Sequence, residues 1–407
     1  SLRKLGKDKT IIVPKGNYDR IKRDLHQMGF HNVVELKHGE TFEVNPNFKI
    51  TSYQFGVFLD SAIVLEVDGK VLLNLNDSKH MGPTLKQILK NHPPIDFVFR
   101  SHSSANSRLC YEIVDDEELK VDDISQYIKN FANTVLATGA KYAVPFASNH
   151  CHLHPEVMHF NEIVQTPRLV EQYFQEHNIT ETEVKVMVSG DIYSDKSGFA
   201  ISDDDWFENR KTKIAQYFEE KRHKIDAQNE KEAKIGVKIE RMEKYFSKFV
   251  KNVPWIMRRG FNKNPITYIL KQGEKESIFN VNLCSGKVQE LENFSVEKNP
   301  IQIHVSAFLM RQCMGMDLFS HLSISKRVKY KTTKKGLKYL KRLNSLFNLY
   351  EYDMLPVHRM FQWRSIETWV LRWREVLLYG LLVKDKLIHK EISFDKYLIL
   401  KSRKHAG

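Results

Sequence analysis

The chain has 407 residues, of which 42% are hydrophobic, so it can bury a large core and divide into two or more units. Its formal net charge of +13 favours anionic partners such as nucleotides, acidic glycans, nucleic acid or an anionic membrane surface. This composition excludes a disordered chain. The sequence contains no run of about 18 apolar residues, so we expect no membrane span.

The four cysteines lie far apart and form no CxxC pair. Such spacing fits a reducing cytoplasm better than a disulfide scaffold, and no signal-peptide pattern is seen, so we expect a cytoplasmic protein. The chain begins with Ser1 rather than Met, and we expect that an N-terminal portion precedes it in the natural protein.

Short apolar runs of strand length dominate the first part of the chain. The clearest pair, 61–67 and 71–75, flanks Asp68 and Gly69, which supply the positive φ angles of a two-residue hairpin turn. Asp77 follows this hairpin, where its carboxylate either meets a cation or caps the next turn. Further strands alternate with segments whose apolar residues recur at helical spacing, and this alternation predicts an α/β layered domain. Those further strands are expected at 11–13, 33–36, 41–44, 48–53, 95–99, 142–146 and 184–188.

Three histidines alternate after the expected strand 142–146, at His150, His152 and His154. In an extended segment they would project to one side, and imidazole suits zinc or iron. They are therefore candidate metal ligands, and polar pockets or surface positions are the alternative. Asp191 ends the next strand and is either a further ligand or a turn residue.

The second half of the chain divides into three segments of different composition and expected structure. Residues 201–247 are highly charged and helical, which predicts a surface connector, and 248–356 is expected to form a second α/β unit with an antiparallel sheet. A helical tail follows at 357–407. Its apolar side chains recur at helical spacing, typical of a core or a partner-helix interface, at Ile366, Trp369, Val370, Trp373 and Leu377.

A basic run opens with Lys326, Arg327 and Lys329 and continues towards Arg342. It is interpreted either as a solvated helix face or as a site for a phosphate group or a membrane surface. Interleaved Tyr330 and Tyr339 would stack on bases or sugars in the second case.

Four segments, taken in order, resemble the motifs of the metallo-β-lactamase superfamily: SAIVLEVDGKVLLNLND, IDFVFRSHSSANSR, AVPFASNHCHLHPE and VKVMVSGD. Within it, they loosely resemble the catalytic region of CMP-N-acetylneuraminic acid hydroxylase and its bacterial relatives. The resemblance covers roughly residues 11–191. It implies an αββα sandwich in a domain spanning 1–200, with a smaller C-terminal α/β unit and a helical tail.

In that superfamily the hairpin Asp orients a metal loop with the pattern HxHxDH, and Asp77 matches this Asp. His102 matches the first histidine of the loop. Ser104, Asn106 and Ser107 stand at the other ligand positions, and their neutral groups are poor substitutes for imidazole and carboxylate.

The resemblance implies a one-metal site as the remaining arrangement. Asp191 matches the metal-bridging Asp, and one of His150, His152 and His154 matches the next histidine. The ligands would then come from His102, these histidines and Asp191, and the metal would be zinc, iron or manganese. The same resemblance implies catalytic roles for Asp191, His154 and Asp77.

Two functions follow as hypotheses. The first is a metal-dependent enzyme of nucleotide-sugar or glycan metabolism, either a hydrolase or a hydroxylase, although a hydroxylase would need a Rieske domain whose paired Cys and His ligands this chain does not supply. The second is a non-catalytic binding or interaction protein on a degenerate metallo-β-lactamase fold, which would dock on an anionic partner or a membrane face through the basic run and the Trp-rich tail. In both cases the expected partner is an anionic small molecule or glycan, which would be nucleotide-linked in the first case. A peripheral membrane contact is the other expected partner, and nucleic acid is not expected.

Overall fold

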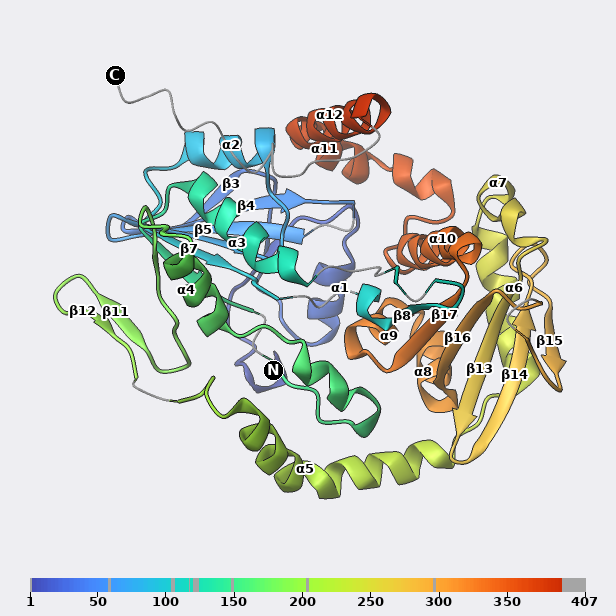
Figure 1. Ribbon diagram of the computed structural model, residues 1–407. Coiled ribbons are helices and arrows are strands. Elements are labelled where there is room, and N and C mark those ends of the chain that lie inside the picture. The colour runs from blue at the N-terminus through green and yellow to red at the C-terminus, as the bar shows by residue number, and fades with distance from the viewer. Residues whose placement is uncertain are drawn as a thin grey trace.

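Most of the fold is built from two large mixed sheets, each with its own helices and its own core (Figure 1). It confirms the mixed α/β class predicted from the sequence. The computed structural model describes residues 2–57, 60–103, 107–116, 118–119, 124–147, 150–202, 205–295 and 298–389. None of the helices within these ranges combines the length and the hydrophobicity that a membrane crossing requires.

The first sheet has seven strands in the described residues. The strands that lie on the β3 side of β6 run antiparallel to their neighbours, whereas β6, β7, β9 and β10 run parallel to one another. In spatial order they are β10 (Glu183–Val184), β9 (Tyr142–Pro145), β7 (Phe97–Arg100), β6 (Lys70–Asn76), β5 (Asp60–Val67), β4 (Phe48–Phe55) and β3 (Glu40–Asn45).

The predicted hairpin is confirmed as β5 and β6. Val67 pairs with Lys70 across the turn, and Asp68 and Gly69 have φ angles of 47° and 80°. These angles lie in the left-handed region that a tight hairpin turn requires, which glycine adopts without strain and aspartate tolerates. The sequence therefore determines the register of this pair by itself.

Three helices pack against the first sheet: α2 (Gly82–Asn91), α3 (Ser125–Thr138) and α4 (Pro167–Glu176). The predicted helix 121–138 is confirmed over the described part of that range. Phe131 of α3 and Phe174 of α4 meet edge to face, with ring centroids 6.3 Å apart, over Leu73 and Val98 of the sheet. Burial of such large side chains is the main source of stability for this unit.

The second sheet has six strands, counted over the described residues. In spatial order they are β15 (Val288–Leu291), β14 (Lys275–Val281), β13 (Ile266–Gln272), β16 (Ile301–Ser306), β17 (Val328–Thr332) and β8 (Tyr111–Ile113). The antiparallel pairing of β13, β14 and β15 agrees with the sequence prediction. The edge strand β8 comes from the range predicted as the first domain, and it pairs in parallel with β17.

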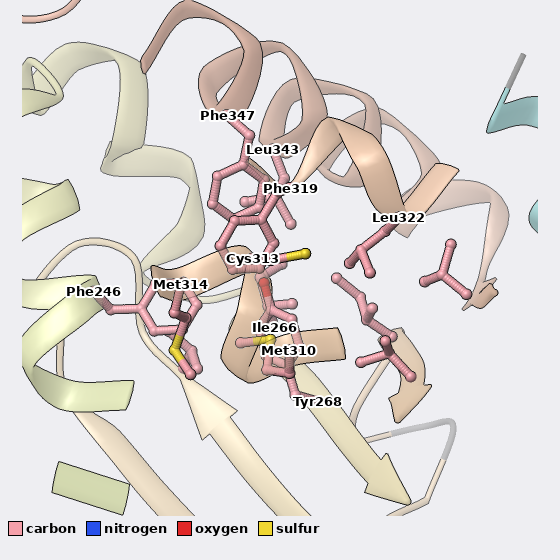
Figure 2. Close-up of a cluster of buried hydrophobic side chains, with 14 of the residues drawn as sticks. Phe246, Ile266, Tyr268, Met310, Cys313, Met314, Phe319, Leu322, Leu343 and Phe347 are labelled. Carbon is pink, nitrogen blue, oxygen red and sulfur yellow. The ribbon is translucent and has the colours of Figure 1, made fainter. Parts of the chain in front are cut away.

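The helices α6 (Ile239–Asn252), α8 (Ala307–Met316), α9 (Ser320–Ser325) and α10 (Lys334–Glu351) cover the second sheet. Figure 2 shows part of this core, where Phe319 and Phe347 lie face to face, with ring centroids 4.3 Å apart. Phe246 of α6 packs on Tyr268 of β13. Because α6 belongs to this core, the second unit begins before residue 248.

The remaining elements connect or flank the two units. Helix α5 (Arg210–Ala233) buries only Glu232 and is the surface helix predicted for the connector. The C-terminal helices α11 (Trp363–Leu371) and α12 (Trp373–His389) return to the first unit, where α12 lies beside α2 (Figure 1). Short elements complete the chain: β1 (Ile11–Pro14), α1 (Arg20–Gln27), β2 (Val33–Leu36), β11 (Ile192–Ser194), β12 (Gly198–Ala200), α7 (Trp255–Arg258) and the 3-10 helices η1 (Leu2–Lys4), η2 (Ser107–Cys110), η3 (Pro155–Glu162), η4 (Arg259–Phe261) and η5 (Val357–Phe361).

Candidate functional site

A cavity of about 940 Å³ lies between the second sheet and the 3-10 helix η3. Strands β8, β13, β16 and β17 contribute its floor, and His159 and Phe160 of η3 contribute to its wall. Lys326, Arg327 and Lys329, which the sequence offers as substrate or phosphate ligands, all line it. A cavity of this volume is in the range that small-molecule ligands and cofactors occupy.

Arg327 and Lys329 both lie in ion pairs with carboxylates. Arg327 pairs with Glu232 of α5 and with Glu156 of η3, and Lys329 pairs with Glu112 at 2.5 Å. These pairs reduce the excess positive charge that the basic run would otherwise bring to the cavity. Lys326 has a side chain that is almost fully buried.

The basic run is partly a strand, and its interpretation as a solvated helix face is wrong for β17. Val328 and Tyr330 alternate with Lys329 and Lys331, so the two apolar side chains enter the core while the lysines point away from it. Burial raises the pKa of Tyr330 well above its usual value. Tyr330 therefore offers no free face for stacking on a base or sugar. Tyr339, on α10, packs beside Phe261.

His102 lies just beyond β7 and is completely buried. Its Nε2 lies 3.2 Å from the carbonyl oxygen of Gln165, and its Nδ1 is buried without a hydrogen-bond partner. Burial lowers the pKa of His102 to about 4, the hydrogen bond to Gln165 opposes this shift, and His150 adds to it. The imidazole is therefore neutral near pH 7, with Nε2 donating its proton to the carbonyl and Nδ1 carrying a lone pair.

His150 and His152 follow β9, the strand next to β7, and their rings meet edge to face with centroids 5.1 Å apart. Asn161 holds the backbone of His152 through two hydrogen bonds, of 2.8 and 2.7 Å. We call His102, His150 and His152 the imidazole cluster. The cluster forms because β7 and β9 are parallel neighbours, whose carboxyl ends lie at the same edge of the sheet.

The surroundings of His152 are basic. Burial, together with smaller contributions from His150, Lys326, Arg210 and His159, lowers the pKa of His152 to about 4. Lys326 and His159 also line the cavity, so the imidazole cluster lies beside it. An environment of this kind favours a negatively charged ligand group.

Arg210, from the first turn of α5, binds the loop that carries the cluster. Its Nη2 donates to the carbonyl oxygen of His150 at 2.8 Å, and its Nε is buried without a hydrogen-bond partner. Burial lowers the pKa of Arg210. Arg210 could not be identified from the sequence, because it lies in a highly charged segment where no pattern distinguishes one arginine. His159 was not among the predicted site residues either, although it follows three other histidines closely in the sequence.

His154 does not join the cluster, whereas the alternation in the sequence predicts all three histidines on one side. Its Nε2 lies 2.8 Å from Oδ1 of Asn229 on α5, and its Nδ1 accepts a hydrogen bond from the backbone of Glu156. The segment turns into η3 immediately after His154, so the extended geometry that would align the three rings ends there.

Asp191 is engaged in a turn at the start of the β11–β12 hairpin. Its Oδ2 accepts a hydrogen bond from the backbone of Val188 at 2.7 Å, and its Oδ1 accepts bonds from the backbone and hydroxyl of Ser202. Slight burial raises the pKa of Asp191, but these hydrogen bonds outweigh it and the net shift is downward. The carboxylate thus has the turn role that the sequence allowed as an alternative.

Asp77 is exposed at the carboxyl end of β6. It lies near Arg100 at the end of β7: burial lowers the pKa of Arg100 to about 10, and Asp77 opposes that shift. Arg100 also donates to the carbonyl oxygen of Ser78 at 3.2 Å. Asp77 thus lies beside the loops that follow β6 and β7. This position agrees with an orienting role better than with direct metal binding.

Among the described residues, no group of three or more His, Cys, Asp or Glu side chains is arranged to hold a metal ion. Ser104 and Asn106 of the predicted metal loop lie outside the described residues, as does the side chain of Ser107. The donor atoms described do not fit a metal with three protein ligands, and the basic surroundings fit an anion better.

No protein-family model matches the chain, and no curated protein matches it.

Proposed function

We propose that this chain binds an anionic small molecule, a sugar or nucleotide-linked sugar that carries a phosphate or carboxylate, in the cavity beside the imidazole cluster. The observation that carries this proposal is the basic environment of His152, in which Arg210, Lys326 and two further histidines all favour its neutral form. In this function the protein is a binding module on a degenerate metallo-β-lactamase fold.

The geometry supports distinct roles for the two parts of the site. The buried Nε–H of Arg210 lacks a hydrogen-bond partner, and a buried guanidinium donor of this kind is suited to a phosphate or carboxylate oxygen. The body of the ligand would lie in the cavity against Phe160 and the β-sheet floor. Paired cations such as Lys329 would contribute less, because Glu112 already compensates their charge.

The test is calorimetric titration of the full chain with cytidine 5′-monophosphate, with N-acetylneuraminic acid and with uncharged cytidine. We expect the two anions to bind and cytidine to bind at least about tenfold more weakly. Arg210→Gln should weaken anion binding by about tenfold, and Lys329→Gln, a paired cation of the same cavity, serves as the matched control. Equal affinity for all three probes, or equal effects of the two substitutions, would overturn the proposal.

The pH dependence gives a second readout. An anion at the cluster stabilises the protonated form of His152, so binding is linked to proton uptake and the affinity should rise from about pH 7 to about pH 5. His152→Asn should remove this rise. Affinity that falls or stays constant over this range would contradict a role for His152 beside the anion.

A second candidate is a metal-dependent enzyme of nucleotide-sugar or glycan metabolism, of hydrolase or hydroxylase type. Its specific support is His102, whose neutral ring keeps Nδ1 buried and unpaired, an uncommon state for a polar atom in a core. This function also rests on the proposed αββα sandwich, of which the seven-stranded sheet would supply one half.

Elemental analysis of the purified chain separates the two candidates. Stoichiometric zinc, iron or manganese that is lost in His102→Ala, together with turnover of a phosphate ester or CMP-linked sugar, would favour the enzyme. Metal-free protein that still binds cytidine 5′-monophosphate would favour the binding module. The four cysteines are unpaired, which supports the proposed location in a reducing cytoplasm.

A further inference from the structure

The C-terminal helices α11 and α12 have reversed amphipathicity. The side chains that they bury are mainly polar, with helical spacing: Ser365, Thr368, Arg372, Glu375, Leu378 and Asp385. The side chains that they expose are apolar: Ile366, Val370, Leu371, Trp373, Val376, Leu377, Val383, Leu387 and Ile388, with Phe361 and Trp363 just ahead of them or at their start. A surface helix in water shows the opposite arrangement. We call the exposed apolar set the outer face.

The orientation of the helices is held by specific contacts of the buried set. Arg372 donates to the carbonyl oxygen of Gly56 at 2.7 Å, and Glu375 accepts from the backbone N–H of the same residue at 2.9 Å. Leu378 packs between Phe55 and Met81. Turning the outer face inward would break both hydrogen bonds to Gly56 and would expose Leu378, whereas the Arg372–Glu375 pair lies within the segment and moves with it.

The outer face is large and aromatic. Trp363 is 77% exposed, Val370 64%, Trp373 54% and Leu387 79%. Single exposed apolar side chains are ordinary, but a set that recurs at helical spacing along two successive helices marks a surface that binds another apolar phase. Figure 1 shows α11 and α12 at the top of the molecule, outside both sheets.

The charge on this segment identifies the partner. Every carboxylate between residues 357 and 389 is turned inward: Glu367 pairs with Lys15 and Lys37, Glu375 is buried against Arg372, and Asp385 is buried. The cations Arg374 and Lys384 remain partly or fully exposed, and Arg374 lies over the ring of Trp373 at 4.5 Å. A second copy of the same face would place cations against cations, whereas an anionic lipid surface complements them.

We propose that the outer face of α11 and α12 docks the protein on an anionic membrane surface, with the helices lying in the interface plane. Tryptophan, valine and leucine would enter the headgroup and acyl boundary, and Arg374 and Lys384 would bind lipid phosphates or carboxylates. The site is separate from the cavity beside the imidazole cluster, so it does not rest on the proposed ligand.

The test is co-sedimentation of the full chain with phosphatidylcholine vesicles, with and without phosphatidylserine. We expect binding that requires phosphatidylserine, weakens with salt and shifts tryptophan emission to the blue. Trp363→Ala combined with Trp373→Ala should weaken binding by about tenfold or more. Arg374→Glu combined with Lys384→Glu should remove the dependence on phosphatidylserine.

Trp255 on α7 is the matched control, because it is 63% exposed and also lies beside an arginine, Arg259. Trp255→Ala should bind vesicles as the unsubstituted chain does, and thermal unfolding should confirm that all variants are folded. Vesicle binding that is independent of phosphatidylserine, or unchanged in the double tryptophan variant, would overturn the proposal. A dimer in solution that the same double variant dissociates would assign the face to a second copy instead.

Discussion

Arg327 and Glu232 form a two-pronged ion pair, in which Nη1 and Nη2 of the arginine lie 2.9 and 2.7 Å from Oε1 and Oε2 of the glutamate. The pair joins the last turn of α5 to the start of β17 across a boundary between two parts of the chain. Both side chains are nearly buried, with 12% and 8% of their surfaces exposed. Arg327, which the sequence offered as a candidate phosphate ligand, thus has a structural partner.

We predict that Arg327→Ala lowers the free energy of unfolding by about 3 kcal/mol, because it leaves the Glu232 carboxylate buried without its partner. Denaturant unfolding of Arg327→Ala, Glu232→Ala and the double variant should show a coupling energy above about 1 kcal/mol. Lys248→Ala breaks an exposed pair with Asp317 and should cost less than about 1 kcal/mol. Equal costs for Arg327→Ala and Lys248→Ala would refute this prediction.

The buried histidines predict a loss of stability in acid. Burial lowers the pKa of His80 to about 3 and that of His102 to about 4, whereas an unfolded histidine titrates near 6.5. Between these values the unfolded chain takes up protons that the folded chain excludes, so stability falls as the pH falls below about 6.5. The contribution of His102 lost by pH 4 is on the order of 3 kcal/mol.

Denaturant unfolding at several pH values measures this effect. His102→Asn should flatten the pH dependence even though it lowers stability at neutral pH, and substitution of the exposed His31 by Asn should leave it unchanged. The same slope in all three proteins would show that His102 does not exclude a proton in the fold.

Two helical glycines predict opposite effects of the same substitution. A Cβ at Gly336 would lie 2.7 Å from the carbonyl oxygen of Pro300, which is backbone and cannot move aside cheaply, so Gly336→Ala should destabilise the protein by about 2 kcal/mol. A Cβ at Gly380 meets nothing within 4 Å, so Gly380→Ala should stabilise α12 by up to about 1 kcal/mol. Thermal unfolding checks both, and shifts of the same sign would contradict the packing argument.

The turn role of Asp191 predicts that Asp191→Ala is a local change. Losing its hydrogen bonds to Val188 and Ser202 should cost about 1 kcal/mol, since no residue of the β11–β12 hairpin is fully buried. Affinity for cytidine 5′-monophosphate should change by less than about twofold, because the residue is not among the groups around His152. Loss of bound metal or of turnover in this variant would restore the one-metal site that the resemblance implies.

Local chemistry determined several elements in advance. Asp68 and Gly69 specify a hairpin because their left-handed φ angles suit only a tight turn, and the helical spacing of apolar residues specifies α3 and the C-terminal helices. Such signals are read within a few neighbouring residues. They are therefore present in the sequence without knowledge of the rest of the fold.

The candidate site depended on contacts between distant residues. His102 and His150 meet because β7 and β9 are adjacent, and Arg210 reaches His150 from 60 residues away. The pairing of Tyr330 with Tyr111, on an edge strand from the first half of the chain, likewise cannot be read from the basic run itself. The sequence indicated the histidines as candidates, but only the tertiary structure separated His154 from the cluster.

The apolar side chains of the C-terminal helices, from Ile366 to Leu377, show most clearly what the sequence decides and what the tertiary structure decides. Their spacing in the sequence determined a helical segment with an apolar face, and such a face is normally buried. The tertiary structure decided its direction, because Arg372 and Glu375 find Gly56 as a partner 316 and 319 residues away and thereby turn the polar side inward. Periodicity defines which residues share a face, and long-range hydrogen bonds and ion pairs decide where that face points.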